Sequence, residues 1–424
     1  MSKLVSYTEA LAILRDAAVL QPTETVRLSL LAGRVTAETI SAQIDVPSFH
    51  NSAMDGFALV AADTQGATPE NPVILSIAAC LAAGDSASTT SATQAISGTA
   101  VEIMTGAPVP EGYDAVIMVE KANPQHDAEG KTISIRVERP LEAGENLRYR
   151  GEDFQAGSPI VSTGTLLQAR HLAGLAATGT AEAEVYVMPT VAVLATGKEI
   201  SDDYGQALAD SAIYNSNAPY LTSELNAAGI HARYVGNIGD DPELFSRWLD
   251  ELSHERILIS SGAVSKGRWD FIPEVLQQKG AKILFHGVAI KPGKPVLFAV
   301  LPDGRYFFGL PGNPIASAVG LRFFVQPLLR ALLGMEAEAF PRVRLNKPYT
   351  KKGDLRHFLK SLLGYTPEGD LRVTILDGQE SFRIAPLLQT NAWSIVEEDQ
   401  NALNPDETLS VAPAALFSTA FSAL

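Results

Sequence analysis

The chain has 424 residues, 46% hydrophobic and 19% charged, a composition that excludes an intrinsically disordered protein and predicts several folded domains. Its 33 basic and 48 acidic residues give a net charge of −15, which argues against nucleic acid and anionic membranes as partners. The single cysteine, Cys80, excludes an internal disulfide, a zinc–cysteine cluster and an iron–sulfur cluster. Because Cys80 lies in an apolar run, we expect a buried structural thiol. The N-terminus does not read as a signal peptide and no apolar run predicts a membrane span, so we expect a cytoplasmic protein.

Helical segments are expected near the N-terminus. Leu11 and Leu14 recur at helical spacing, which predicts a helix over residues 7–19, and a second short helix is predicted over residues 28–34. Helical spacing returns over residues 166–177.

The pattern changes after Pro47. Short β-like runs separated by Gly, Pro, Asp and Asn predict a β-rich insert, with strands over residues 57–60, 73–79, 115–119 and 133–137.

Strands and helices alternate from Pro189 onward. Strands are predicted over residues 191–195, 231–236, 256–260, 283–288, 295–300 and 306–310, and helices over 218–228, 242–252, 271–278 and 314–333. Alternation with apolar strands predicts an open α/β sheet covered on both faces, whose ligands bind beyond the carboxyl ends of the strands. After Gly334, strands over 342–345, 371–375 and 408–411 predict a small C-terminal β domain.

Three widespread enzyme motifs are absent. No two glycines stand two positions apart, so the dinucleotide fingerprint G-x-G-x-x-G is missing, and the chain contains neither a P-loop nor H-E-x-x-H. These absences argue against a nicotinamide dehydrogenase, a P-loop NTPase and a zinc peptidase.

Three polar clusters lie in the expected insert. Asn51, Ser52 and Asp55 offer oxygens to a metal, although a turn that leads into a strand explains them better on local chemistry. Thr105, in a Pro/Gly-rich loop, offers donors to an oxyanion. Asp153 lies beside two arginines, Arg148 and Arg150, where a solvated ion-pair surface and a phosphate and cation site are equally good interpretations.

The α/β region carries small-residue loops after its strands, at residues 196–199, 260–265 and 310–314. Small residues let backbone N–H groups approach an anion, and two such loops at one sheet edge favour anion binding over simple tight packing.

Lys291 and Lys294, on a Pro/Gly-stiffened loop, form a compact positive site. Carboxylates hold Mg²⁺ beside phosphate, and five are candidates: Asp55, Asp153, Glu199, Asp240 and Asp270. The residues alone therefore predict a Mg²⁺-dependent enzyme acting on a phosphorylated small molecule.

In order and spacing, these clusters resemble the molybdopterin molybdenumtransferase family, the MoeA group that also includes the C-terminal domain of gephyrin. The resemblance runs from about residue 6 to about residue 415, and its motifs are jointly specific: 51–56, 103–110, 150–153, 260–265, 291–295 and 310–314.

The resemblance implies a multidomain α/β and β fold, in an elongated homodimer. Its domains would be a discontinuous helical N-terminal domain (1–40 plus 158–188), the β-rich insert (41–157), a molybdopterin-binding open α/β sheet domain (189–337) and a C-terminal β-barrel (338–424). The implied reaction inserts molybdate into adenylylated molybdopterin with Mg²⁺-dependent release of AMP. Its active site would lie between the α/β domain of one subunit and the insert of the other.

The resemblance carries residue roles over to this chain. Catalytic roles fall to Asp55, Thr105, Asp153, Glu199, Asp240, Asp270, Lys291 and Lys294, with the five carboxylates as candidate Mg²⁺ ligands. Contacts with the pterin and oxyanion substrates fall to Ser52, Thr196, Gly197, Ser260, Ser261, Gly262, Ser265, Pro311, Gly312, Asn313 and Ser381. Contact with the molybdopterin adenylyltransferase is a further implied partnership.

Some positions depart from the family pattern. Lys198 stands where the family commonly has Asp, and Gly287 stands where some members carry a lysine. Glu380 stands where Gly is usual, which puts an anion contact of Ser381 in doubt.

Two alternatives stay open beside this interpretation. Molybdopterin adenylylation uses a similar α/β domain, but a lone domain of about 150 residues would suffice for it, so the large insert favours the insertion step. A non-catalytic scaffold would not need to retain Asp55, Asp153, Asp270 and Lys291. The sequence does not choose between molybdate and tungstate.

Overall fold

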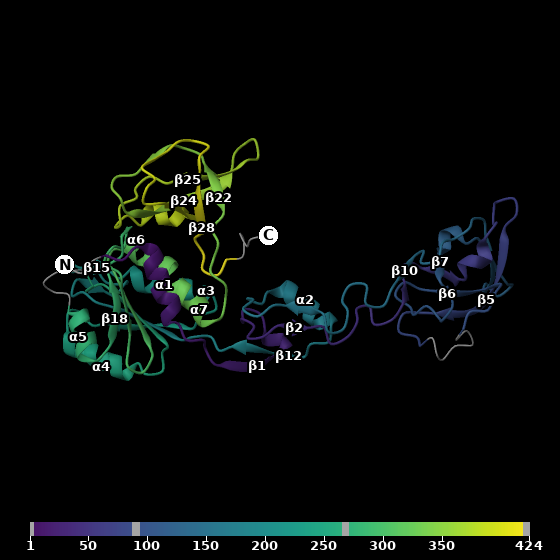
Figure 1. Ribbon diagram of the computed structural model, residues 1–424, viewed down its shortest axis with the longest axis horizontal. Coiled ribbons are helices and arrows are strands. Elements are labelled where there is room, and N and C mark those ends of the chain that lie inside the picture. Colours follow the sequence, from purple (N-terminus) through teal and green to yellow (C-terminus); the bar gives the residue numbers. More distant parts are fainter. Residues whose placement is uncertain (1–3, 87–93, 265–270, 419–424) are drawn as a thin grey trace.

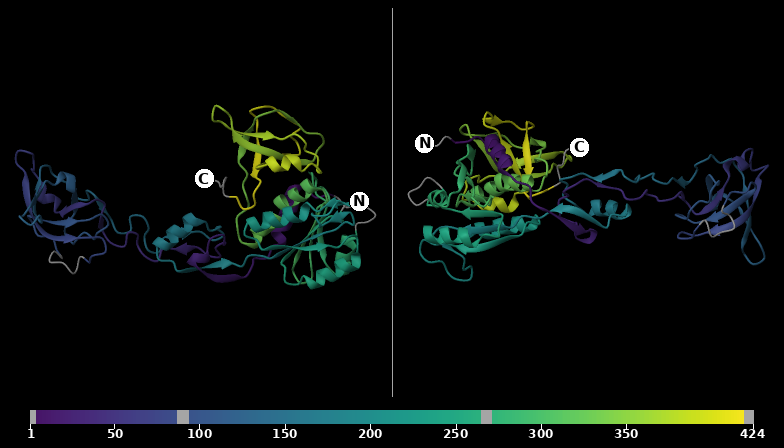
Figure 2. Two further views of the ribbon diagram at one scale, coloured as in Figure 1. Left: turned by 180° about the vertical axis from the view of Figure 1, so that it is seen from behind. Right: turned by 60° about the horizontal axis from the view of Figure 1, so that its bottom comes forward.

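The computed structural model describes residues 4–86, 94–264 and 271–418. The chain is elongated, with a β-rich unit at one end and an α/β unit carrying a small barrel at the other (Figure 1). A small unit lies between them, and Figure 2 shows the same separation from two further directions.

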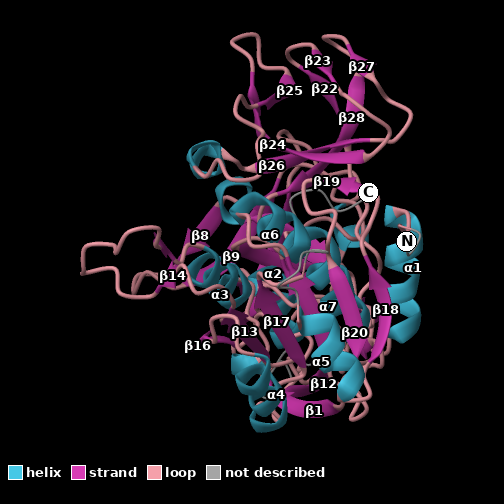
Figure 3. Cartoon of the chain, turned by 90° about the vertical axis from the view of Figure 1, so that its left-hand side faces the viewer, coloured by secondary structure: helices cyan, strands magenta, loops and turns pink. Residues whose placement is uncertain are grey.

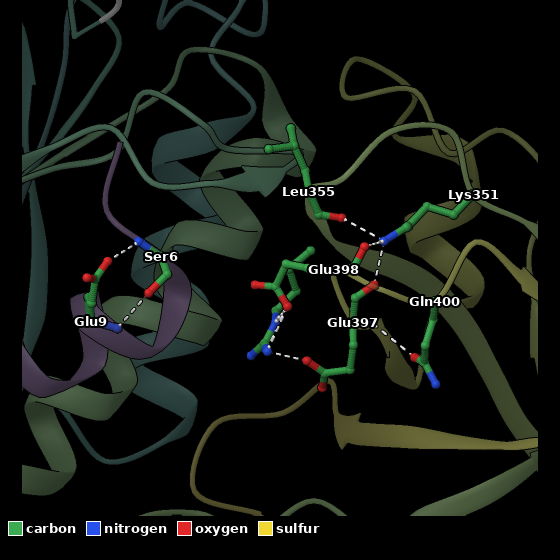
Figure 4. Close-up of polar contacts among 8 residues, drawn as sticks. Ser6, Glu9, Lys351, Leu355, Glu397, Glu398 and Gln400 are labelled. Carbon is green, nitrogen blue, oxygen red and sulfur yellow. Dashed lines mark hydrogen bonds and ion pairs between the residues drawn. The ribbon is translucent and has the colours of Figure 1, made fainter. Parts of the chain in front are cut away.

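Helix α1 (Tyr7–Ala17) begins the described fold and carries a reciprocal cap. The Ser6 backbone N–H donates to Glu9 Oε2 at 2.7 Å, and the Glu9 N–H donates to Ser6 Oγ at 3.1 Å (Figure 4). This capping box satisfies two backbone donors that the first helical turn leaves free, so the helix starts where the sequence predicts.

The small middle unit is discontinuous in sequence and mostly β. Strand β1 (Thr23–Arg27) pairs with β12 (Glu182–Tyr186), and β2 (Ile40–Ser41) pairs with β11 (Pro159–Val161). Helix α2 (Ala169–Ala177) contributes Leu175 to its core. The helix expected over 28–34 is only a 3₁₀ turn, η1 (Leu28–Leu30).

The β-rich insert folds around a six-stranded sheet with the order β7-β4-β6-β5-β9-β8. The strands are β4 (Gly56–Leu59), β5 (Val73–Leu81), β6 (Thr99–Ile103), β7 (Ala115–Met118), β8 (Pro124–His126) and β9 (Thr132–Val137). The 3₁₀ turns η2 (Ala61–Thr64) and η4 (Val119–Lys121) follow β4 and β7. A separate short pair joins β3 (Asn51–Ser52) to β10 (Leu147–Arg148).

The expectation that Cys80 is buried is wrong. Cys80 is exposed on β5, while its neighbour Leu81 is fully buried. Successive side chains of a strand point to opposite faces, so an apolar run does not bury all its members when only one face packs.

The α/β unit is built on a six-stranded sheet with the order β16-β13-β17-β21-β20-β18. The first four strands are parallel: β16 (Ala232–Asn237), β13 (Val191–Ala195), β17 (Ile257–Ser261) and β21 (Tyr306–Leu310). The antiparallel strands β20 (Leu297–Val300) and β18 (Lys282–His286) complete the other edge.

Helices cover both faces of this sheet, as the alternating pattern predicts. Helices α4 (Pro242–Glu251) and α5 (Ile272–Gln278) lie on one side, and α3 (Asn217–Ala227) and α6 (Pro314–Gly320) on the other (Figure 1). Two separate hydrophobic clusters fill the two interfaces, so the sheet is buried on both faces.

The predicted long helix over 314–333 is present with a local change of winding. Helix α6 continues through a π-helical segment, η5 (Leu321–Val325), into α7 (Gln326–Leu332). The helix at Pro314–Leu332 is apolar and long enough to cross a membrane, but 83% of its most apolar window is buried inside the fold. Packing in the core therefore explains its apolar character.

Helix α1 packs on this long helix rather than in the middle unit, where we expected it. Tyr7 is buried against Phe324 and Phe358, with ring centroids 5.8 and 5.2 Å away. These contacts join α1, the α/β unit and the C-terminal barrel in one hydrophobic cluster.

The C-terminal unit is a closed five-stranded barrel, because β24 pairs with both β25 and β26. Its strands are β22 (Arg342–Leu345), β24 (Arg356–Tyr365), β25 (Leu371–Ile375), β26 (Ala392–Val396) and β28 (Thr408–Pro413). The short strands β23 (Tyr349–Thr350) and β27 (Ala402–Leu403) form a side pair, and η6 (Ala385–Gln389) is a 3₁₀ segment. Strand β19 (Ile290–Lys291) reaches from the α/β unit and pairs with β24 at the junction of the two units (Figure 3).

A buried lysine ties the rim of the barrel together. The Lys351 ammonium donates to the backbone carbonyls of Leu355, Glu397 and Glu398 (Figure 4). Arg356 forms ion pairs with Glu397 and Glu398 and lies 4.9 Å from the centre of the Tyr7 ring. The same segment therefore also fixes α1 to the barrel.

Candidate functional site

A cavity of about 480 Å³ lies at the carboxyl edge of the parallel strands. Three loops meet there: Thr196–Gly197 after β13, Ser261–Gly262 at the end of β17, and Pro311–Asn313 after β21. The expectation that loops distant in sequence converge at this edge is therefore confirmed.

The loops are interlocked by backbone hydrogen bonds. The backbone N–H and the hydroxyl of Thr196 donate to the Ser261 carbonyl, at 3.0 and 3.2 Å, and the Gly262 N–H donates to the Leu310 carbonyl at 2.9 Å. Gly262 has φ +106°, and a Cβ there would lie 2.5 Å from Thr196 Oγ1 and 2.7 Å from the Thr196 carbonyl oxygen. The close approach of these loops requires glycine at this position.

Two asparagines that the sequence analysis did not select also line the cavity, Asn215 and Asn217. Asn217 Nδ2 donates to Ser261 Oγ at 2.6 Å and to the Gly312 carbonyl at 2.7 Å. One buried side chain thus fixes the spacing of the second and third loops. The triplet Asn-Ser-Asn at the start of α3 is typical of an ordinary helix start, and only the folded contacts show the second role of Asn217.

Two candidate carboxylates, Glu199 and Asp240, line the same cavity and are exposed. Neither has a side-chain hydrogen bond or ion pair with another described residue, so both have free oxygens. No group of three or more His, Cys, Asp or Glu side chains able to hold a metal occurs in the described parts of the chain. Two carboxylates and a ligand phosphate suit Mg²⁺, which usually takes only one or two protein carboxylates.

Three further predicted residues fall outside this lining. Ser260 is fully buried and does not line the cavity, because alternation along β17 turns it away from the face that Ser261 presents. Asp270 and Ser265 lie outside the described residues.

The predicted lysines and Ser381 do not line this cavity. Lys291 lines a second cavity of about 440 Å³ beside the barrel, together with Lys347, His357 and Glu380. Lys294 is exposed and lines neither of these two cavities. The Ser381 carbonyl accepts a hydrogen bond from the N–H of Ile315, at 3.0 Å, directly after the third loop.

The second cavity is lined by two lysines, Lys291 and Lys347, and by two carboxylates, Asp377 and Glu380. Its buried histidine, His357, lies opposite Lys291 in the β19–β24 pairing. Burial, and then the charges of Lys291 and Lys351, lower the pKa of His357 to about 4. His357 is therefore neutral near pH 7, while Lys291 and Lys347 supply positive charge.

The insert holds the remaining candidates. The backbone N–H and the hydroxyl of Thr105 donate to Asp55 Oδ1, at 2.7 and 2.8 Å. These bonds, the backbone one first, lower the pKa of the exposed Asp55 carboxyl. Ser52 is fully buried beneath them, so its place is structural support for the loop.

The third polar cluster has an unexpected partner. Arg150 Nε forms an ion pair with Asp45 Oδ2 at 2.6 Å, and the Asp45 pKa is lowered by the Ala156 N–H and then by Arg150. Asp153 is exposed and has no ion pair with any residue that the structure describes. Within one chain, the insert lies at the opposite end of the molecule from the α/β unit (Figure 2).

Comparisons with known proteins cover nearly the whole chain. Residues 5–179 match the MoeA N-terminal region (domain I and II), residues 192–331 the probable molybdopterin binding domain, and residues 342–414 the MoeA C-terminal region (domain IV).

Relatives match over similar lengths. The molybdopterin molybdenumtransferase of Synechococcus elongatus is 34% identical over 94% of this chain and 97% of its own. That of Bacillus subtilis is 34% identical over 92% and 89%. A crystal structure of the molybdopterin biosynthesis MoeA protein from Pyrococcus horikoshii OT3 is 26% identical, covers 97% of this chain and 100% of its own, and has a TM-score of 0.81. On these matches, the chain belongs to the MoeA family of molybdopterin molybdenumtransferases.

Proposed function

We propose that the chain inserts molybdate into adenylylated molybdopterin, with Mg²⁺-dependent cleavage of the pyrophosphate link and release of AMP. The observation that carries this proposal is the meeting of three small-residue loops and two free carboxylates around one cavity of about 480 Å³. Loop N–H groups suit the phosphates of the substrate, and the carboxylates suit a cation bound to them.

In this proposal, Glu199 and Asp240 hold Mg²⁺ from the α/β unit, and Asp270 is a third candidate. Bound Mg²⁺ would neutralise charge on the cleaved phosphoanhydride. Thr196, Gly197, Ser261 and Gly262 would orient the phosphates, and Asn217 would keep the loops at their spacing.

We further propose that molybdate binds in the second cavity. Lys291 and Lys347 supply positive charge for an oxyanion there, and Asp377, which lines the same cavity, offsets part of it. Glu380 in the same lining also opposes this charge, so molybdate affinity should rise when Glu380 is replaced by glutamine. Soft sulfur ligands come from the pterin, so no cysteine is needed at the metal.

The insert residues would complete the site from a second copy of the chain. The β-rich insert, which carries Asp55, Thr105 and Asp153, lies at the opposite end of the chain from the α/β unit (Figure 1), so these residues would reach the cavity only from a second copy. Asp55, held ionised by Thr105, would then face the phosphates or the cation. A cytoplasmic location and hand-over of substrate from the molybdopterin adenylyltransferase are part of this proposal.

The test is AMP release from adenylylated molybdopterin in the presence of Mg²⁺ and molybdate. The proposal expects molybdate-dependent release that is lost in Asp55→Ala and Asp240→Ala. Asp210→Ala is the matched control, because Asp210 is exposed and does not line the cavity. Absence of release from the folded wild-type protein would refute the proposal.

A further inference from the structure

The loop between β13 and α3 forms one wall of the main cavity. Residues 199–215, called the flap below, contain the short strands β14 (Ile200–Ser201) and β15 (Ile213–Tyr214), which pair in parallel. Four flap residues line the cavity: Glu199, Ile200, Ile213 and Asn215. The position of the flap therefore decides where the proposed Mg²⁺ ligand Glu199 lies.

A closed triangle of hydrogen bonds fastens the flap. Tyr234 Oη donates to Asp202 Oδ2 at 2.7 Å, and Asn215 Nδ2 donates to Asp202 Oδ1 at 2.8 Å and to Tyr234 Oη at 3.1 Å. Both oxygens of the Asp202 carboxylate are thus engaged by neutral donors, and such charge-assisted bonds are the stronger kind.

One residue of the triangle belongs to the central sheet. Tyr234 lies on β16, the edge strand of the central sheet, and Asn237 on the same strand donates to the carbonyls of Gly197 and Ile200 at 3.0 and 3.1 Å. Two side chains of one strand therefore hold the flap at separate points.

Asn215 links the triangle of hydrogen bonds to the lining of the cavity. Its side chain is 3% exposed, and its Oδ1 accepts a hydrogen bond from the Ala218 N–H at 3.0 Å, at the start of α3. Asn217, two residues further on, holds the second and third loops. A change at Asp202 therefore reaches the loops through a short run of bonded groups.

Tyr234 contributes to the triangle as a neutral phenol that donates to Asp202. Tyr234 is half-buried, and burial, followed by the hydrogen bond to Asp202, raises its pKa. The phenol therefore stays protonated at neutral pH and keeps its hydrogen for donation.

We propose that Asp202 is a positioning residue that holds the flap against the cavity through Tyr234 and Asn215. Asp202 does not itself line the cavity, so it acts on the site only through these two partners. The predicted effect on the kinetics rests on the proposed function. The predicted effect of these hydrogen bonds on the position of the flap does not.

The first test is hydrogen exchange of the flap amides in the full-length protein. Tyr234→Phe removes one hydroxyl and keeps the ring, and exchange in residues 199–215 should become about ten-fold faster. Tyr214→Phe is the matched control, because its hydroxyl donates to the Gln206 carbonyl within the flap and forms no hydrogen bond with Asp202, Asn215 or Tyr234. Unchanged flap exchange in Tyr234→Phe would overturn the proposal.

The second test is the kinetics of AMP release. Asp202→Ala and Tyr234→Phe should each raise KM for adenylylated molybdopterin roughly three- to ten-fold and leave kcat within about two-fold, because both lower the fraction of closed flap. The double variant should show no more than the larger single effect, since both changes break the same triangle. Additive effects, or loss of the Mg²⁺ requirement in Asp202→Ala, would contradict a positioning role. If the wild type releases no AMP, the proposed function fails, and exchange alone decides the question of the flap.

Discussion

Replacing Gly262 by alanine tests whether the interlocked loops form the substrate site. The added Cβ would lie 2.5 Å from Thr196 Oγ1 and 2.7 Å from the Thr196 carbonyl oxygen. The hydroxyl can rotate away, but the carbonyl belongs to the loop after β13 and must move with it. The backbone at Gly262 also has φ +106°, which an L-residue rarely adopts.

The expected cost has two parts. The positive φ costs about 1–2 kcal/mol, and displacing a packed backbone costs roughly 1–3 kcal/mol more. Gly229→Ala separates them, because Gly229 has φ +79° in the same α/β unit but an added Cβ would meet only the Gly33 carbonyl oxygen, at 3.9 Å. We expect Gly262→Ala to lower the free energy of unfolding by about 2–5 kcal/mol and Gly229→Ala by about 1–2 kcal/mol.

Urea unfolding of the two variants measures the stability difference, and AMP release measures the effect on the site. Gly262→Ala should also raise KM for adenylylated molybdopterin about ten-fold or more, because the first two loops must separate to admit the methyl group. Gly229→Ala should leave KM near the wild-type value. Equal stability of the two variants, with unchanged KM in both, would refute the contact between the loops and its role in binding.

Three further outcomes follow from the site. Thr105→Val removes the hydroxyl bond to Asp55 but keeps the backbone one, so the Asp55 pKa should rise and the acid limb of the pH profile of AMP release should shift to higher pH. A limb that stays in place would show that Asp55 does not set it. The pKa of His357 is lowered to about 4 in the native fold. Between pH 6.5 and 4, this imidazole is therefore protonated in the unfolded chain but mostly neutral in the native protein. Stability should therefore fall over this range by at most about 3 kcal/mol, and His357→Leu should flatten the fall in urea unfolding at pH 7 and 5. Asn217→Ala deletes bonds to Ser261 and Gly312 and should cost about 1–3 kcal/mol and raise KM, whereas a stable variant with normal KM would contradict its role as a spacer.

The strands and loops of the α/β unit could be predicted because their signals are local. β13 is a fully apolar run of five residues, and the small-residue loop that follows it has no other local explanation than a turn or an anion site. The carboxyl ends of parallel strands then necessarily meet, which brings Thr196, Ser261 and Gly312 together.

The barrel strand β24 was not predicted, because its polar residues are not typical of a buried strand. His357, Lys360 and Ser361 are all buried there, and the Lys360 ammonium donates to the carbonyls of Gly378, Glu380 and Arg383. A lysine is almost never fully buried unless its charge is met, and the groups that meet it come from a loop some 20 residues away along the chain. No local sequence pattern predicts such a distant partner.

The contacts of the site between residues far apart in the sequence could not be predicted for the same reason. Asn217 contacts Ser261 and Gly312, which lie 44 and 95 residues further along the chain. Arg150 pairs with Asp45 across 105 residues, although nearer carboxylates were available in its own cluster. Grouping the lysines with the loops was likewise too simple, since Lys291 lines the cavity beside the barrel instead.

The central claim is that the insert of one copy completes the α/β cavity of another, and mixed dimers test it most directly. Asp55→Ala and Asp240→Ala chains carrying different tags are co-expressed, and dimers with one chain of each kind are purified. Each parent alone should release no AMP. If the site is shared, a mixed dimer has one site with both defects and one intact site, so it should show about half the wild-type rate. If each site lies within a single chain, the mixed dimer has no intact site, and a rate as low as that of the parents would contradict the account.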